Sequence, residues 1–412
     1  MRVLWVFALF LAVASRGYSA EPDDQFKTLY RARQWFTLRD AVAGVGAPAF
    51  YRGAVAWAFN DPRKAEELLR QAIAAAPGSW EAIEAHRLLT TWYSLTGQYR
   101  RAFREYKVVH ELMPNSDSVK REVQALKVWS RYPQPAVRSR HESSVRYDLK
   151  DGDIFLPIVV NGSEAHYLID TGSNICLISE REAKRVGMIL DPAPGLQIHD
   201  SSGTSGGFRI AVAKELVLGG FRLRNVMFLV LPDDRLPFAN LPVGWRGILG
   251  LPVLFAWQTV RWNRDGTFEV GFRSGAYSQR TANLCFSGEG PHPVVRGEFA
   301  KKPVEMVLDT GAMKSRLLPF FAESFAEVVH GHGQKEVTQL RGTIGSKEIE
   351  TLVLPEASLR IGDFDTVLRP AELVKNYGPF GNSQYHIWLG SDLLQQARQV
   401  TIDFGSMRVV LE

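Results

Sequence analysis

The spacing of apolar residues divides the chain into two parts with different secondary structure. From residue 23 to residue 130, apolar residues recur at intervals of three and four, Ala and Leu are common, and strand-like alternation is absent. This pattern predicts an all-α region. From about residue 147, short runs rich in Val, Ile, Leu and Phe are separated by Gly, Pro, Asp and Asn, which predicts an all-β region. Helices are expected to interrupt the strands at 179–187 and 320–329.

Residues 131–146 separate these two parts. They contain two prolines and many polar residues, and they show no apolar period. Such a composition is typical of a linker. The sequence therefore predicts a helical domain at 21–130, a linker at 131–146 and β-rich structure from residue 147 onward.

The helical region contains a repeat. The stretch that begins at residue 97 matches the one that begins at residue 60, with Ala102 in the place of Ala65 and Pro114 in the place of Pro77. A small Ala lets one helix pack closely on the next, and the proline closes the second helix. The region resembles the tetratricopeptide repeat (TPR), although Asn60 replaces the usual turn glycine. The resemblance implies docking of a peptide or partner protein; the alternative is that the helices only pack on the rest of the chain.

The β-rich part repeats one short phrase in matched surroundings. YLIDTGSNIC and MVLDTGAMKS each run from apolar residues into Asp-Thr-Gly. Two apolar residues and a glycine recur downstream of each, in GILGLPVL with Gly250 80 residues after Asp170, and in IWLGSDLL with Gly390 81 residues after Asp309. The matched segments are 167–176 with 306–315, 217–220 with 359–362, Gly250 with Gly390, and 260–270 with 400–410. Chance explains so many matches poorly, so we interpret them as a duplicated lobe, with copies at 147–275 and 276–412.

Asp170 and Asp309 are the candidate catalytic residues. Cleaving an amide without a metal or a covalent intermediate requires a base that activates water and an acid that protonates the carbonyl. Two carboxyl groups that share one proton can do both, because like charges a few ångströms apart cannot both ionise cheaply. Such a pair titrates as a unit.

The duplicated phrases resemble the loops of the pepsin and retropepsin aspartic proteases. The paired Asp-Thr-Gly loops and their paired glycine partners carry this resemblance, which covers about residues 147–412. It implies a bilobal all-β domain in one chain, with the candidate pair in a cleft between the lobes. It also implies hydrolysis of peptide bonds without a cofactor or a metal.

The resemblance assigns supporting roles to the residues around each aspartate. Thr171 and Thr310 would bond across to the opposite loop and fix the two carboxyl groups. Gly172 and Gly311 would let the backbone turn tightly and point N–H groups at the carboxylate oxygens.

The two loops differ at the next position. Ser173 could donate a hydrogen bond to Asp170 and favour its charged form, whereas Ala312 could not do the same in the second loop. We therefore expect Asp170 to be the more ionised partner. Gly250 and Gly390 are expected to support the loops from below.

Two Gly-rich segments could form hairpin flaps over a substrate. They are 199–208 in the first lobe and 341–346 in the second. Pepsins have one flap and retropepsins have two, so two flaps are plausible here. Neither segment offers a counterpart of the pepsin flap tyrosine.

The N-terminus predicts export. Arg2 precedes an uninterrupted apolar run at 3–14, and small residues follow it, with cleavage expected after Ser19 or Ala20. This is the pattern of a secretory signal peptide at 1–20; the alternative is an uncleaved N-terminal anchor. The expected location is periplasmic or secreted, with no stable membrane span after cleavage.

The remaining features of the sequence argue against a nucleic-acid site, a disulfide and a metal site. With 45% hydrophobic residues and a net charge of +5, the chain is globular and lacks a dense basic stripe, so no nucleic-acid partner is expected. Cys176 and Cys285 are interpreted as small buried residues, with a disulfide between them not favoured. His330 and His332 lack a third ligand at metal spacing.

We therefore interpret the sequence as an exported aspartic endopeptidase with an N-terminal TPR-like domain. Its expected partners are a peptide or protein substrate and, on the helices, a protein partner. The alternative is a catalytically inactive protease fold that holds peptides as a scaffold.

Overall fold

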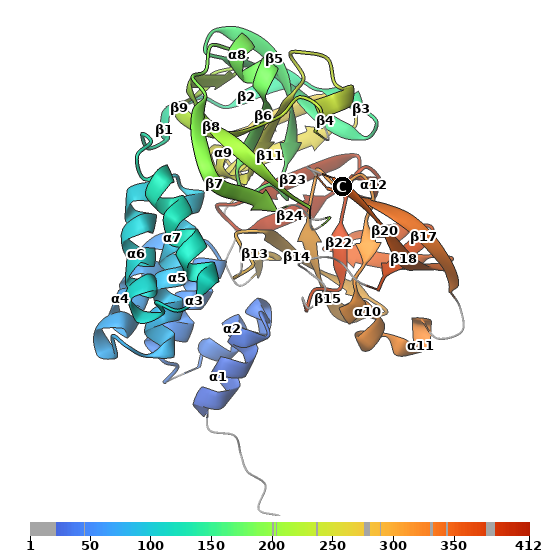
Figure 1. Cartoon of the computed structure of the whole chain (residues 1–412). Coiled ribbons are helices and arrows are strands. Elements are labelled where there is room, and N and C mark those ends of the chain that lie inside the picture. Colours follow the sequence, from blue (N-terminus) through green and yellow to red (C-terminus); the bar gives the residue numbers. More distant parts are fainter. Residues whose placement is uncertain are drawn as a thin grey trace, which may run out of the picture.

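The computed structural model describes residues 22–44, 46–199, 202, 204–235, 238–275, 281–288, 290–329, 333–342, 345–375 and 384–412. The predicted signal peptide and the pair His330 and His332 lie outside these residues. Figure 1 shows a helical region beside two β-rich lobes.

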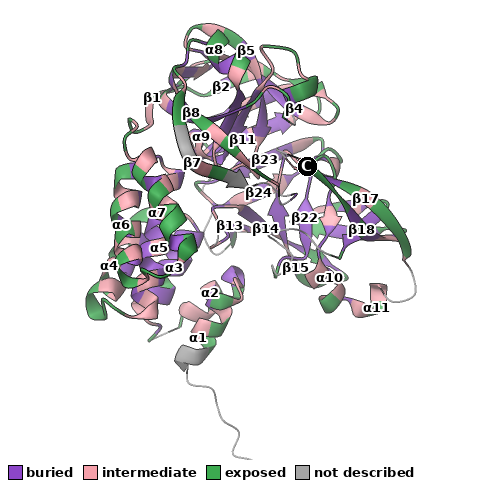
Figure 2. Cartoon of the chain, viewed as in Figure 1, coloured by how far each residue is buried: buried purple, intermediate pink, exposed green. Residues whose placement is uncertain are grey.

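Helices make up the described chain up to Trp129. They are α1 (Pro22–Arg31), α2 (Trp35–Val42), α3 (Ala49–Ala58), α4 (Pro62–Ala75), α5 (Trp80–Leu95), α6 (Tyr99–Leu112) and α7 (Asp117–Trp129). Asp61, Ser79 and Ser116 precede α4, α5 and α7, and their side chains accept hydrogen bonds from backbone N–H groups of the first turn. Ala65 and Ala102 are buried where α4 and α6 pack on their neighbours. In Figure 2 the core of this region lies on α3 and α5, while α4 and α6 expose one face.

The first lobe is built on one sheet. Its elements are β1 (Ala136–Arg140), β3 (Asp148–Lys150), β4 (Asp153–Val160), β5 (Ser163–Asp170), β6 (Cys176–Ser179), α8 (Glu180–Arg185), β7 (Asp191–His199), β8 (Ser205–Leu218), β9 (Phe221–Leu231), a 3-10 turn (Phe238–Asn240), β10 (Gly247–Gly250) and α9 (Leu251–Trp257). The strand order is β1-β9-β6-β10-β5-β4-β8-β7, with β3 on β4. Because β8 pairs with both β4 and β9, the sheet closes on itself.

The second lobe repeats this arrangement. Its elements are β13 (Leu284–Phe286), β14 (Pro293–Phe299), β15 (Lys302–Leu308), β16 (Arg316–Leu317), α10 (Pro319–Ser324), α11 (Ala326–Val329), β17 (Gln334–Arg341), β18 (Ser346–Leu354), β19 (Ala357–Ile361), β20 (Phe364–Leu368), β21 (Ala371–Val374), β22 (Ile387–Leu389) and α12 (Ser391–Leu394). The order β21-β16-β22-β15-β14-β19 matches β9-β6-β10-β5-β4-β8 strand for strand. The pairing directions agree as well, since β10 runs parallel to β5 and β22 runs parallel to β15. The predicted duplication is therefore present in the fold.

A third sheet joins the lobes. It has the order β2 (Ser143–Arg146), β12 (Thr267–Val270), β11 (Thr259–Asn263), β23 (Gln399–Asp403) and β24 (Arg408–Leu411). The repeated segments 260–270 and 400–410 form its two hairpins, and β11 pairs with β23 at the centre. The lobes thus share a continuous backbone ladder.

The expectation that 131–146 is a linker is wrong for most of its length. Residues 136–140 form β1 on the edge of the first lobe, and residues 143–146 form β2 on the edge of the joining sheet. Their polar sequence shows no apolar period because edge strands are held mainly by backbone hydrogen bonds to a neighbour, which local pattern does not reveal. The two helices expected within the lobes are present, but the second one breaks at Phe325 into α10 and α11.

The helical region packs tightly against the β-rich part. Trp57 meets Phe286 with ring centroids 6.3 Å apart, and Trp92 meets Phe255 at 5.5 Å. Asn60 donates a hydrogen bond to the carbonyl of Phe404, at 2.6 Å. These contacts fix the helices beside both lobes and the joining sheet.

Candidate active site

The two aspartates end equivalent strands. Asp170 is the last residue of β5, and Asp309 directly follows β15. The residues before them, Leu168, Ile169, Val307 and Leu308, are all buried. Apolar burial on both strands fixes the backbone that carries each carboxyl group, while the two aspartates remain partly accessible.

The threonines of the two loops bind each other across the lobe boundary. Thr171 N–H donates to Thr310 Oγ1 at 3.0 Å, and Thr310 N–H donates to Thr171 Oγ1 at 3.0 Å. The Thr171 hydroxyl donates to the carbonyl of Leu308 at 2.9 Å, and the Thr310 hydroxyl donates to that of Ile169 at 3.1 Å. Both threonines are buried. These four bonds lock the loops into one rigid unit.

The glycines bring each loop against the opposite aspartate. Gly172 N–H donates to Asp170 Oδ1 at 2.8 Å, and Gly311 N–H donates to Asp309 Oδ1 at 3.0 Å. A Cβ at Gly172 would lie 2.5 Å from the carboxyl carbon of Asp309, and one at Gly311 would lie 2.5 Å from that of Asp170. Only glycine leaves room for the two carboxyl groups to approach.

Gly250 and Gly390 lie beneath the loops. A Cβ at Gly250 would be 2.5 Å from the carbonyl oxygen of Ile175, and one at Gly390 would be 2.6 Å from that of Ala312. The residue after each glycine donates its N–H to the loop above, Leu251 to Ser173 and Ser391 to Ala312. The strands β10 and β22 therefore support the two loops at close range.

The carboxyl groups of Asp170 and Asp309 share a hydrogen bond. Removal from water, the charge of Asp309 and this bond raise the pKa of Asp170 well above its usual range. Removal from water also raises the pKa of Asp309, but the indole N–H of Trp388 opposes this shift by donating to Asp309 Oδ2 at 2.8 Å. The arrangement favours a proton on Asp170 and a charge on Asp309.

This distribution reverses the one expected from the sequence. The hydroxyl of Ser173 donates to the carbonyl of Ile175 at 2.7 Å and is used inside its own loop. The donor that makes the pKa values of the two aspartates differ is the indole N–H of Trp388. This role was not predicted from the sequence. Its signal was visible in the duplication, because Trp388 in IWLG occupies the place of Ile248 in GILG.

One comparison with known proteins concerns the first lobe. A family model described as aspartyl protease matches residues 156–253, a range that includes Asp170 and Gly250. Together with the repeated lobe topology, this match decides the fold. The chain has the fold of an aspartic protease.

Two solved structures match parts of the chain at low sequence identity. The crystal structure of a retropepsin-like aspartic protease from Rickettsia conorii shares 14% identity and covers 33% of this chain and 93% of its own, with a TM-score of 0.24. Basic 7S globulin from soybean shares 13% identity and covers 65% of this chain and 93% of its own, with a TM-score of 0.40. A search of curated proteins returned no match.

Two hairpins of the aspartic-protease fold reach toward each other. They are β7–β8 in the first lobe and β17–β18 in the second, at the segments expected as flaps. Residues 200, 201, 203, 343 and 344 of their tips lie outside the described residues. Beside them, a Cβ at Gly345 would lie 2.6 Å from Thr204 Oγ1, so the two hairpins are in contact.

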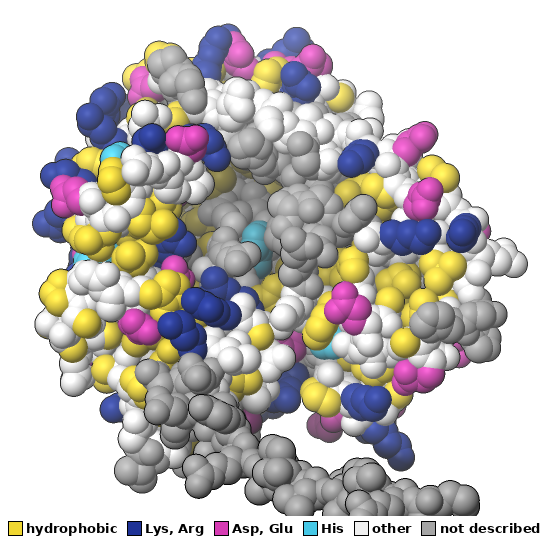
Figure 3. All heavy atoms as spheres, turned by 60° about the horizontal axis from the view of Figure 1, so that its bottom comes forward, with side chains coloured by type: hydrophobic (Ala, Val, Ile, Leu, Met, Phe, Trp, Pro, Cys, Tyr) yellow, Lys and Arg dark blue, Asp and Glu magenta, His cyan; other side chains and the backbone are white. Residues whose placement is uncertain are grey.

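Within the described ranges, no group of three or more His, Cys, Asp or Glu is arranged to hold a metal ion. Cys176 and Cys285 are buried, and neither forms a disulfide. None of the described helices is long and apolar enough to span a membrane. Figure 3 shows a hollowed face on which basic side chains are scattered among acidic ones.

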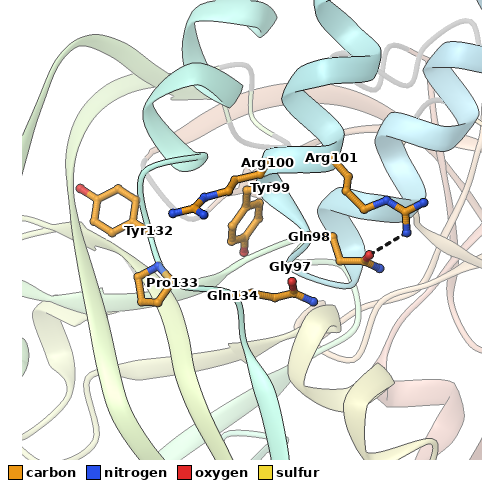
Figure 4. Close-up of a pocket in the computed structure, with 8 residues that line it drawn as sticks. All are labelled: Gly97, Gln98, Tyr99, Arg100, Arg101, Tyr132, Pro133 and Gln134. Carbon is orange, nitrogen blue, oxygen red and sulfur yellow. Dashed lines mark hydrogen bonds between the residues drawn. The ribbon is translucent and has the colours of Figure 1, made fainter.

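A small pocket lies apart from the aspartates. It has a volume of about 230 Å³ and is lined by Gly97–Arg101 at the start of α6 and by Tyr132–Gln134 after α7 (Figure 4). Pro135 packs against Gly97 beside it. The pocket therefore belongs to the junction between the helices and the first lobe.

Proposed function

We propose that this protein is an aspartic endopeptidase that hydrolyses peptide bonds with a water activated between Asp170 and Asp309. The observation that carries the proposal is a single pair of carboxyl groups, one from each lobe, that share one hydrogen bond. The N–H of Trp388 stabilises the charged form of Asp309 in this pair. This is the arrangement that lets one carboxyl act as base and the other as acid.

The order of proton transfers in the reaction follows from the proton on Asp170 and the charge on Asp309. Ionised Asp309 takes a proton from the water as its oxygen attacks the carbonyl carbon. Asp170 gives its proton to the carbonyl oxygen, which yields a neutral gem-diol. The proton held by Asp309 then passes to the amide nitrogen as the C–N bond breaks, and Asp170 takes back the hydroxyl proton of the forming acid. The dyad ends with the one proton with which it began.

The surroundings suit an extended peptide. The β7–β8 and β17–β18 hairpins are proposed to cover the substrate, because they come from different lobes and touch at Thr204 and Gly345. The helical region is proposed to dock a protein partner or to shape access to the cleft. On the basis of its N-terminal sequence alone, we propose that the protein works outside the cytoplasm.

Digestion of a complex peptide mixture, read by mass spectrometry over a range of pH, tests this proposal. The wild-type chain is expected to cut internal bonds, and cleavage should vanish in Asp309→Asn and with a transition-state-mimicking aspartic-protease inhibitor. Folded wild-type chain that cuts nothing at any pH would favour the peptide-binding scaffold. Cleavage that persists in Asp309→Asn would exclude the dyad as its source.

A further inference from the structure

The duplication places one polar residue at the same register position relative to each aspartate. In the first lobe, Phe155 pairs with Leu168, and continuing this antiparallel register by two residues sets Asp153 opposite Asp170. In the second lobe, Val294 pairs with Val307, and the same step sets His292 opposite Asp309. Asp153 and His292 therefore occupy equivalent places at the two sides of the dyad.

The two side chains differ in what they meet. Nε2 of His292 lies 3.4 Å from Nδ2 of Asn174, which belongs to the loop of the opposite lobe. The residue equivalent to Asn174 in the second loop is Met313, whose side chain is 49% exposed and has no N–H or O–H to donate. The polar contact made on one side of the dyad thus has no counterpart on the other.

Asp153 is left with an unsatisfied oxygen. Its Oδ1 is shielded from solvent and accepts no hydrogen bond from any described residue. Removal from water and the charges of Asp151 and Asp309 raise the pKa of Asp153 to about 7. A shielded carboxylate oxygen without a donor is unfavourable, and an added donor or cation would relieve that cost.

The turn that carries Asp153 is held against the second lobe. The carbonyl of Gly152 accepts a hydrogen bond from Gln395 Nε2 at 2.6 Å. A Cβ at Gly152 would lie 3.9 Å from Ser391 Oγ, on the helix that follows Gly390. Asp153 therefore lies at the lobe boundary, where the charge of Asp309 reaches it, on a turn anchored from both lobes.

We infer that Asp153 determines specificity by receiving a basic side chain, Lys or Arg, of the bound peptide on one side of the scissile bond. This inference rests on the proposed endopeptidase function. An ammonium or guanidinium group supplies the missing donors and a compensating charge, and a charge-assisted bond at a partly shielded site is worth more than a neutral one. A neutral substrate side chain would leave Asp153 Oδ1 unsatisfied.

Paired peptides test the inference. The best-cut sequence from a peptide library is made with Lys at each position, or with norleucine, which keeps the four side-chain carbons and lacks the ammonium group. The value of kcat/KM is then measured for the full chain. The wild type should prefer Lys at one position by about 10-fold or more, and Asp153→Asn should reduce that ratio to near one.

Asp151→Asn is the matched control. It removes the carboxylate of an exposed residue on the same turn, and the φ of 53° at Asp151 suits asparagine. It should keep a Lys preference at least as high as the wild type, because it also removes a charge that disfavours ionised Asp153. Cleavage of both peptides without a Lys preference at any position would overturn the inference and leave the endopeptidase proposal standing. A preference unchanged in Asp153→Asn would also overturn it. Failure to cut any peptide would overturn both.

Discussion

The indole N–H of Trp388 donates to Asp309 Oδ2 over 2.8 Å, and this contact makes the two aspartates unequal. Removing the donor destabilises the charged form of Asp309, so its pKa must rise. Trp388→Phe is therefore expected to move the acid limb of the profile of kcat/KM against pH upward by about one pH unit. A profile that keeps its acid limb in Trp388→Phe would contradict the assignment of Asp309 as base.

Ser173→Ala separates the structural account from the expectation based on sequence. The Ser173 hydroxyl bonds to the carbonyl of Ile175 and not to Asp170. The acid limb should therefore stay in place in this variant. A shift as large as that of Trp388→Phe would restore the sequence-based hypothesis that Ser173 tunes Asp170.

The crossed threonines should matter for stability. Thr171→Val keeps the shape of the side chain but leaves the buried N–H of Thr310 and the carbonyl of Leu308 without their partner. The free energy of unfolding should fall by about 2–4 kcal/mol, measured by urea denaturation. Thr171→Ser keeps the hydroxyl and should lose clearly less. Unfolding of Thr171→Val at the same free energy as the wild type would show that these hydrogen bonds do not stabilise the loops.

The close approach at Gly172 should be intolerant of any side chain. Gly172→Ala puts a Cβ against the carboxyl group of Asp309, so the loops must separate. We expect a loss of peptide cleavage of about 100-fold or more in kcat, because the dyad depends on positioning within a fraction of an ångström. Gly78→Ala is the control, since no atom of the described residues lies within 4 Å of a Cβ there. Wild-type kcat in Gly172→Ala would refute the close packing of the dyad.

Much of the site could be predicted from the sequence, because a duplicated motif indicates a duplicated local geometry. Asp170 and Asp309, the crossed threonines and the supporting glycines could be placed from spacing and resemblance. Trp388 was missed because its role depends on which side chain faces Asp309 across neighbouring strands. The strands at 136–140 and 143–146 were missed for a similar reason, since their pairing partners, β9 and β12, lie far along the chain.

The helical region was predicted as a separate domain, but its packing has a testable consequence. Trp57 is buried against Phe286 of the second lobe. Trp57→Ala should lower the free energy of unfolding by about 3–5 kcal/mol, as measured by urea denaturation. Leu112→Ala, at a side chain that is 40% exposed, should cost much less. Similar small losses in both variants would mean that this packing contributes little.

The central claim is that one aspartate from each lobe forms a single catalytic unit. It is tested most directly by kcat/KM for one cleaved peptide in the wild type, Asp170→Asn, Asp309→Asn and the double variant, all verified as folded. We predict that each single substitution lowers the rate by about 1,000-fold or more and that the double variant is no slower than the singles, because residues that act as a unit are not additive. Near wild-type cleavage in either single variant, or losses that multiply in the double variant, would contradict the account.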